Sequence, residues 1–183
     1  MQCTADIVEQ LWARHETLIS TDHGAKYQVI FSRPHSFFDL IIADKRESIG
    51  FITLKDEGKG IYSIVNDTEI NFHPSFINTP GHGIEVKEKY RKRGIGGALI
   101  SLGVGIIKKY RQANQKSKRF MIVASDITSE GLGCYRNFGF NVREGMSVSA
   151  AYYTNYKMMP EINILPARVS FFKRLRGRLK LIK

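Results

Sequence analysis

The spacing of hydrophobic residues changes near residue 90 from a period of two to a period of nearly four. Ile84 and Val86 alternate with polar residues, which is typical of a strand. Further along, hydrophobic residues recur at helical spacing: Ile95, Leu99, Leu102, Ile106 and Tyr110. The sequence therefore predicts a strand, a turn and a long apolar helix that begins near Gly94.

The same patterns predict the other elements. Before the turn we expect a helix over Asp6–Leu18 with Leu18 facing inward, strands over Tyr27–Phe31, Phe37–Ala43 and Ile49–Leu54, and a hairpin of Ile61–Val65 with Glu69–Phe72. After it we expect a strand over Phe120–Ser125, a short helix that carries Tyr135, and closing strands over Val142–Glu144 and Tyr152–Met159. These elements predict an α/β (α+β) fold.

The turn itself has the composition of a phosphate site. Its sequence, from residue 91, is Arg-Lys-Arg-Gly-Ile-Gly-Gly-Ala. The first turn of a helix has unpaired N–H groups and the positive end of the helix dipole, and glycines let an anion approach them closely. Leu99 stands where a dinucleotide fingerprint needs a third glycine, and no Gly-Lys-Ser/Thr follows, so both nucleotide motifs are excluded. We interpret the turn as a pyrophosphate cradle.

Two motifs together resemble a known family. Arg-x-x-Gly-x-Gly at 91–96 is similar to the coenzyme A pyrophosphate loop of the GNAT N-acetyltransferases, and Tyr-x-x-x-Gly-Phe at 135–140 resembles the helix that ends the family's core. The resemblance covers about residues 27–159 and implies a GNAT domain over 1–160, with acetyl-CoA as cosubstrate. The fold it implies has a mixed central sheet of about six or seven strands flanked by helices. The residues it implies for the cofactor are Val86, Arg91, Lys92, Arg93, Gly94, Ile95, Gly96, Gly97, Ala98 and Thr128. It also implies that 66–82 is an insertion, which either walls the acceptor pocket or forms a plain surface loop.

The resemblance implies transfer of an acetyl group to a primary amine of a small molecule or protein, by direct attack in a ternary complex. Tyr135 would then be the general acid beside the coenzyme sulfur, and Glu85 the base that takes the amine proton. His82 and Asp126 remain alternative bases, and each of the three candidates also has a purely structural interpretation. Thr128 stands where many members have an asparagine, so its cofactor contact would differ. No metal is implied.

Charge adds a second feature. The chain has 28 Lys and Arg against 17 Asp and Glu, a formal charge of +11, and residues 161–183 form a basic tail. From Pro166 onward the tail predicts an amphipathic helix, because Val169, Phe172, Leu175 or Arg176, Leu179 and Ile182 follow one another at spacings of three or four. It would bind an anionic membrane surface or nucleic acid, or dock on the domain. Two further functions therefore stay open: acyl transfer to a nucleic-acid-linked amine such as an aminoacyl-RNA, and a non-catalytic, membrane-associated acyl-CoA-binding module.

The cysteines and the apolar runs bear on the cellular setting. Cys3 and Cys134 give neither a disulfide framework nor metal-ligand spacing, and we expect Cys134 to pack as a small hydrophobe. The first 20 residues contain charges that interrupt any signal peptide, and the apolar run 95–107 is too short to cross a bilayer. We expect a cytoplasmic protein, peripheral at the inner membrane surface if the tail binds lipid, with an unknown amine acceptor and the option of a homodimer.

Overall fold

The computed structural model describes residues 4–20, 25–64, 84–117, 119–125, 127, 129–143 and 149–153. Its helices are α1 (Thr4–Arg14), the 3₁₀ turn η1 (Glu88–Tyr90), α2 (Ile95–Ala113) and α3 (Ser129–Asn137). Its strands are β1 (Glu16–Ser20), β2 (Lys26–Ser32), β3 (Phe37–Asp44), β4 (Glu47–Gly58), β5 (Ile61–Ile64), β6 (Ile84–Val86), β7 (Met121–Ala124), β8 (Asn141–Arg143) and β9 (Ser149–Tyr153).

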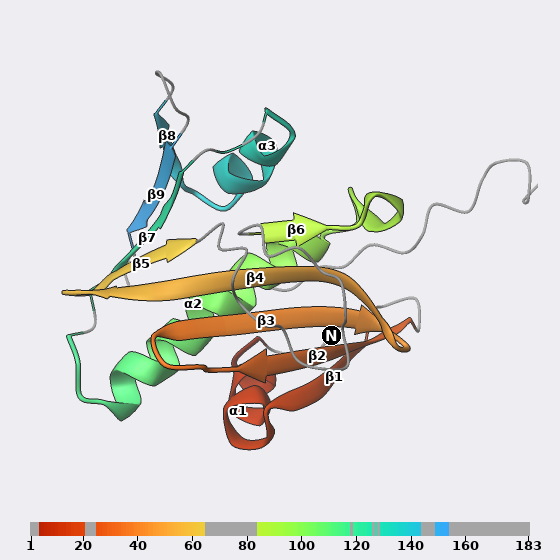
Figure 1. Cartoon of the computed structure of the whole chain (residues 1–183), viewed down its shortest axis with the longest axis horizontal. Coiled ribbons are helices and arrows are strands. Elements are labelled where there is room, and N and C mark those ends of the chain that lie inside the picture. The colour runs from red at the N-terminus through yellow and green to blue at the C-terminus, as the bar shows by residue number, and fades with distance from the viewer. Residues whose placement is uncertain are drawn as a thin grey trace, which may run out of the picture.

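All nine described strands belong to one sheet (Figure 1). The order is β1-β2-β3-β4-β5-β7-β9-β8, and β6 pairs with β4 beside this path. The β5–β7 pair is parallel and the other pairs are antiparallel, so the sheet is mixed. The predicted mixed sheet with flanking helices is confirmed, although it has more strands than the expected six or seven.

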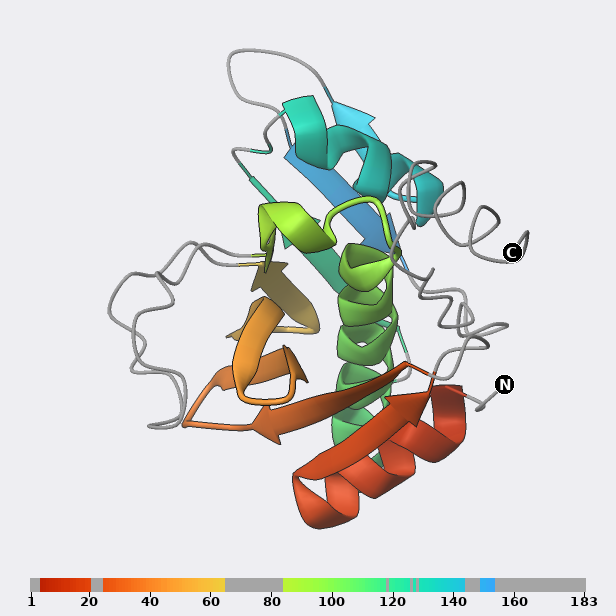
Figure 2. The same cartoon turned by 90° about the vertical axis from the view of Figure 1, so that its right-hand side faces the viewer.

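Helix α2 forms the centre of the core. Figure 2 shows it lying along one face of the sheet, with α1 near its C-terminal end and α3 beyond its N-terminal end. The five residues predicted to line its apolar face are all buried: Ile95, Leu99, Leu102, Ile106 and Tyr110. A Cβ on Gly50 of β4 would lie 2.9 Å from a methyl group of Ile95, so the helix approaches the sheet closely there. The long apolar helix is confirmed.

The prediction for the N-terminal helix is wrong at its end. Helix α1 stops at Arg14, and His15 adopts a left-handed φ of 64° while its N–H donates to the Leu11 carbonyl. This is a common way to end a helix. The chain then forms the edge strand β1, where Leu18 is 53% exposed instead of facing the core. The helical spacing of Leu11 and Leu18 led to a predicted helix that includes residues of the following strand.

Strands β5 and β6 together form one interrupted strand beside β4. Ile64 at the end of β5 pairs with Leu54, and Ile84 at the start of β6 pairs with Ile52. Only Thr53 separates these two pairs on β4, so β5 and β6 follow one another along the same edge of β4 and residues 65–83 connect them. The predicted insertion 66–82 therefore begins and ends inside a strand, while its own structure lies outside the described residues. Because β4 and β7 occupy both edges of β5, the predicted hairpin of 61–65 with 69–72 is wrong.

The last part of the sheet is also shifted. Strand β9 (Ser149–Tyr153) begins three residues before the predicted 152–159 and pairs with β7 and β8, while residues 154–159 lie outside the described residues. The basic tail 161–183 lies outside the described residues, so its helix stays a prediction. Of the helices that the structure describes, none has the length and hydrophobicity needed to span a membrane.

Candidate functional site

The turn between β6 and α2 is held firmly by the protein. The Lys87 N–H donates to the Ile49 carbonyl at 3.0 Å, which extends the β4–β6 pairing to the start of η1. Tyr90 ends η1 as a buried residue, and its hydroxyl donates to the Asp44 carboxylate at 3.1 Å. The loop that follows Tyr90 therefore starts from a fixed point.

Three backbone N–H groups are left open where α2 begins. Gly94 precedes the helix with a left-handed φ of 84°, and the first intrahelical bond runs from the Ala98 N–H to the Gly94 carbonyl at 2.9 Å. The N–H groups of Ile95, Gly96 and Gly97 have no acceptor among the described residues, and the first turn has neither a capping side chain nor an acid. Unpaired amides and the positive end of the helix dipole favour an anion.

The three basic residues before Gly94 have different surroundings. Arg91 turns back toward the strand, and its Nε donates to the Val86 carbonyl at 3.0 Å. The Arg93 guanidinium carbon lies 5.0 Å from the centre of the Tyr90 ring, within cation–π range. Lys92 is exposed and has a left-handed φ of 60°. Besides its predicted role at the cofactor, Arg91 therefore also braces the end of β6.

The glycines of the turn have a second role that the sequence did not reveal. A Cβ on Gly97 would lie 2.6 Å from the Phe138 ring, and a Cβ on Gly96 would lie 3.3 Å from the Cys134 sulfur. Both partners flank Tyr135 in the second motif. The two motifs therefore meet: the end of α3 packs on the first turn of α2 because those positions lack side chains. The sequence signal was present as small residues in one motif and Cys and Phe in the other.

Tyr135 is buried at this junction. It is 4% exposed, and its ring makes an edge-to-face contact with Phe140 at 5.1 Å between centroids. Burial, and to a smaller extent the neighbouring Cys134 thiol, raise the pKa of Tyr135 well above its usual value. Burial likewise raises the pKa of the Cys134 thiol. The phenol therefore stays neutral near pH 7 and keeps its proton.

Strand β6 directs polar backbone groups away from β4. Hydrogen-bonded and non-bonded pairs alternate in an antiparallel ladder, and Lys87 bonds to Ile49. Glu85 therefore bonds to Phe51, while the N–H and C=O of Ile84 and Val86 point to the other side. On that side the described ladders pair β7 with β5 and β9 and leave β6 to β4 alone. The two strands diverge there, as the resemblance implies.

Glu85 and Tyr135 lie on opposite sides of β6. Directly paired residues share a face of a sheet, and Phe51, the partner of Glu85, belongs to a small cluster with Ile41 and Ala43 that is separate from the core beneath α2. Tyr135 belongs to that main core. Glu85 is partly exposed. A carboxylate and a phenol therefore lie on opposite sides of one strand.

The remaining predicted site residues cannot be placed. Thr128, Asp126 and His82 lie outside the described residues. Among the residues that are described, no three His, Cys, Asp or Glu side chains gather closely enough to hold a metal ion.

Comparison with solved structures identifies the fold. The GNAT domain of S. lividans PAT aligns with a TM-score of 0.55 and 9% identity, over 78% of this chain and 98% of that one. Arabidopsis thaliana NAA60 in complex with acetyl-CoA gives a TM-score of 0.46 and 20% identity, over 67% of this chain and 78% of that one. A putative streptothricin acetyltransferase from Bacillus anthracis str. Ames, in complex with acetyl coenzyme A, gives 0.45 and 15%, over 78% and 83%. No protein-family model and no curated protein matches the sequence. The first alignment shows that the chain has the GNAT fold.

Proposed function

We propose that this chain with the GNAT fold is an N-acyltransferase that moves an acetyl group from acetyl-CoA to a primary amine of a small molecule or protein. One observation carries the proposal: the open N–H groups of Ile95, Gly96 and Gly97 lie where β6 diverges from β7, packed against the helix that contains Tyr135. A phosphate site, a strand with open polar groups and a buried phenol are thereby close together.

The residues present fit acetyl-CoA. The three N–H groups and Lys92 would hold the pyrophosphate. The Val86 N–H, which faces away from β4, would pair with the pantetheine arm, while the Val86 carbonyl is already occupied by Arg91. A helix terminus contributes about 0.3 to 2 kcal/mol to anion binding, and micromolar affinity needs about 8 kcal/mol. The strand and the rest of the pocket must therefore supply most of the affinity.

Two residues of the chain would carry out the two proton transfers, one from the amine and one to the departing sulfur. The cosubstrate supplies an activated thioester. A lysine-type amine has a pKa near 10.4 and must lose a proton before it can attack, and Glu85, partly exposed on the far side of β6, is our candidate to accept it. Tyr135 would donate from the other side to the departing sulfur. Because the pKa of Tyr135 is raised, we propose that its neutral phenol donates a hydrogen bond that orients the thioester sulfur before the bond to this sulfur breaks.

Calorimetry with acetyl-CoA tests the binding half of the proposal. Gly96→Glu puts bulk and negative charge beside the open N–H groups and should abolish binding. Gly133→Glu is the matched control, since Gly133 lies on exposed helix α3 with no atom within 4 Å of an added Cβ, and it should leave affinity unchanged. Lys92→Glu, which disturbs no packing, should weaken binding. Unchanged affinity in both Gly96→Glu and Lys92→Glu would refute the proposed phosphate site.

A thiol-release assay with acetyl-CoA over a panel of amines, peptides and RNA tests the catalytic half. Turnover with free amines or peptides supports the proposal. Binding without turnover on any of them would favour a non-catalytic acyl-CoA-binding module. Turnover restricted to an RNA-linked amine, with strong salt dependence, would favour the nucleic-acid alternative.

A further inference from the structure

A second polar hollow lies at the other end of α2, far from the proposed phosphate site. Its volume is about 290 Å³. Three segments form it: the β2–β3 turn with His35 and Ser36, the outer part of β4 with Asp56, and the end of α2 with Tyr110 and Lys116. Fifteen helical residues separate Tyr110 from Ile95, which corresponds to about 23 Å. The hollow is therefore independent of the acyl-transfer site.

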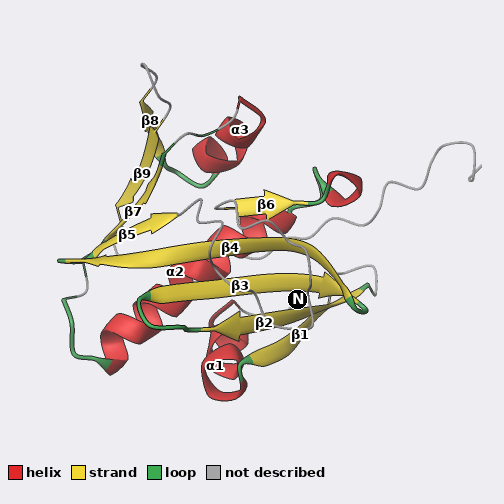
Figure 3. Ribbon diagram, in the orientation of Figure 1, coloured by secondary structure: helices red, strands yellow, loops and turns green. Residues whose placement is uncertain are grey.

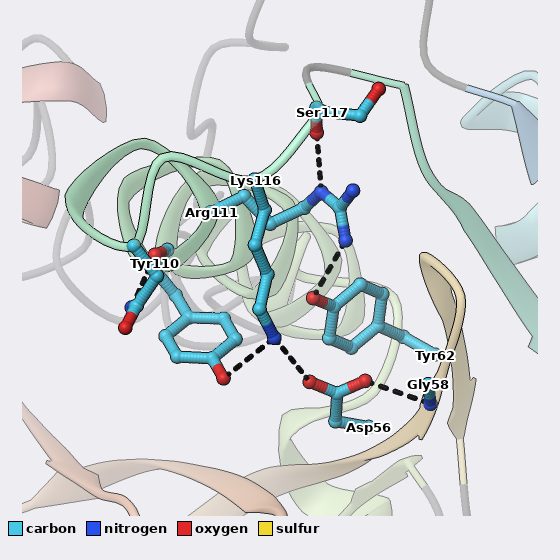
Figure 4. A network of polar contacts seen from close by, with 8 residues as sticks. Asp56, Gly58, Tyr62, Tyr110, Arg111, Lys116 and Ser117 are labelled. Atoms are coloured by element: carbon cyan, nitrogen blue, oxygen red, sulfur yellow. Dashed lines mark hydrogen bonds and ion pairs between the residues drawn. The ribbon is translucent and has the colours of Figure 1, made fainter.

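Lys116 is held in place at this hollow, and its contacts with described residues leave one ammonium hydrogen without an acceptor. Figure 4 shows its ammonium between the Tyr110 hydroxyl, at 2.9 Å, and the Asp56 carboxylate, at 3.4 Å. An ammonium has three donors, and these contacts use two. The Lys116 side chain is 39% exposed and that of Asp56 only 13%, while the second Asp56 oxygen accepts from the Gly58 N–H at 2.9 Å. An approaching ligand would thus meet the cation before the acid.

The β2–β3 turn adds two polar side chains, His35 and Ser36, to the lining of the hollow. The Phe37 N–H donates to the Pro34 carbonyl at 2.9 Å, and the Asp56 N–H donates to the Ser36 carbonyl at 2.7 Å, which ties the turn to β4. His35 has a left-handed φ of 52°, a conformation that costs energy for a residue with a Cβ. Neither its ring nor the Ser36 hydroxyl has a hydrogen-bond partner in the part of the chain that the structure describes.

The charge around the hollow favours an anion. The Arg33 guanidinium carbon lies 4.2 Å from the centre of the Tyr110 ring, within cation–π range, which places a second cation beside this lining residue. The negative end of the α2 dipole points here, but its carbonyls are occupied: the Asn114 amide donates to Tyr110 at 2.8 Å and the Lys116 N–H to Arg111 at 2.8 Å. The exposed groups are therefore mainly cations and neutral donors.

We propose that this hollow binds a small organic anion that carries a carboxylate or phosphate group. The free N–H of Lys116, the Ser36 hydroxyl and the His35 ring would donate to it, and Arg33 would add positive charge. The volume of about 290 Å³ is roughly ten times the share of one water molecule in the liquid, about 30 Å³, so the hollow is larger than a single phosphate group. There is room for the body of a small metabolite as well.

Residue-resolved NMR of the whole chain tests the proposal, with inorganic phosphate and acetate as separate probes. At least one probe should shift the amide signals of Ser36, Phe38 and Lys116 saturably. Signals of Gly94, Gly96 and Gly97 report the proposed phosphate site separately, so failure at one end of α2 is distinguishable from failure at the other. Saturation by both probes or by only one supports the proposal and identifies the anion class.

Two variants and a control make the test specific. Lys116→Gln should weaken the binding about tenfold, the usual effect of losing a hydrogen bond to a charged group. Ser36→Ala removes a hydroxyl without a described partner and should weaken it while the fold is kept. Lys109→Gln, which removes a cation paired with Glu9 on α1, should change nothing. No saturable shift with either probe, or equal weakening by all three substitutions, would overturn the proposal.

Discussion

The contact between Gly97 and Phe138 makes a sharp test of how the two motifs meet. In Gly97→Ala the new Cβ would lie 2.6 and 2.7 Å from two carbons of the Phe138 ring, whereas carbon atoms normally pack at about 3.5 to 4.0 Å. The ring, or all of α3, must move by about 1 Å. Overpacking of this kind costs about 1 to 3 kcal/mol, and alanine in place of helical glycine returns up to about 1 kcal/mol. We expect a net loss of about 1 kcal/mol.

A double-mutant cycle isolates this contact. Phe138→Ala removes the ring, so Gly97→Ala in that background should become stabilising by about 0.5 to 1 kcal/mol. The free energies of unfolding from urea denaturation should then show a coupling of about 1 to 3 kcal/mol. Gly133→Ala is the control on α3, since an added Cβ there has no atom within 4 Å, and it should stabilise the protein. Additive effects at Gly97 and Phe138, within about 0.5 kcal/mol, would refute the proposed packing.

Three further predictions use other parts of the molecule. Tyr135→Phe should lower kcat for acetyl transfer about 10²- to 10⁴-fold with little change in the KM for acetyl-CoA, as measured by thiol release; an unchanged kcat would exclude the phenol from the chemistry. Burial raises the pKa of Asp39 above 3.8, so the folded state binds its proton more tightly and the free energy of unfolding falls as pH rises through that window. Asp39→Asn should therefore stabilise the protein at pH 7 and flatten this slope, as measured by urea denaturation from about pH 4 to 8; a parallel slope in the variant would contradict this. Arg111 is buried and donates to the Ser117 carbonyl at 2.7 Å and to the Tyr62 hydroxyl at 3.2 Å (Figure 4). Arg111→Met should therefore lower the free energy of unfolding by about 2 to 4 kcal/mol. A loss below about 1 kcal/mol would show that these bonds contribute little.

Elements with a clear local pattern could be predicted from the sequence. The helix from Ile95 to Tyr110 has a long periodic pattern, strands β3 and β4 have continuous apolar runs, and all three elements are present (Figure 3). Leu18 was misplaced because its spacing from Leu11 fits a helix, while the left-handed His15 that ends α1 has no hydrophobic signature. Local periodicity identifies where apolar residues recur, but it does not show where the backbone changes direction.

The interrupted strand could not be predicted by local reasoning. Ile64 and Ile84 are 20 positions apart in the sequence, yet they pair with Leu54 and Ile52 on the same edge of β4. That register is fixed by β4 and by the parallel pairing with β7, which are contacts between distant segments. The same holds for the site: the sequence predicts that Gly96 and Gly97 are needed, but the reason, contact with Cys134 and Phe138, depends on how α3 packs.

The two ends of α2 argue for a ligand at its N-terminus. At the C-terminal end, residues of the protein donate hydrogen bonds to the last helical carbonyls: the Asn114 side chain donates to the Tyr110 carbonyl and the Gln115 N–H donates to the Gln112 carbonyl. At the N-terminal end the N–H groups of Ile95 and Gly96 have no acceptor within the described ranges, although leaving a helix end unsatisfied costs stability. A Ser, Thr, Asp or Asn in place of Gly94 would cap this end in most helices. A glycine with left-handed φ leaves those donors open instead, which is expected where an anion from outside the chain is to complete the helix.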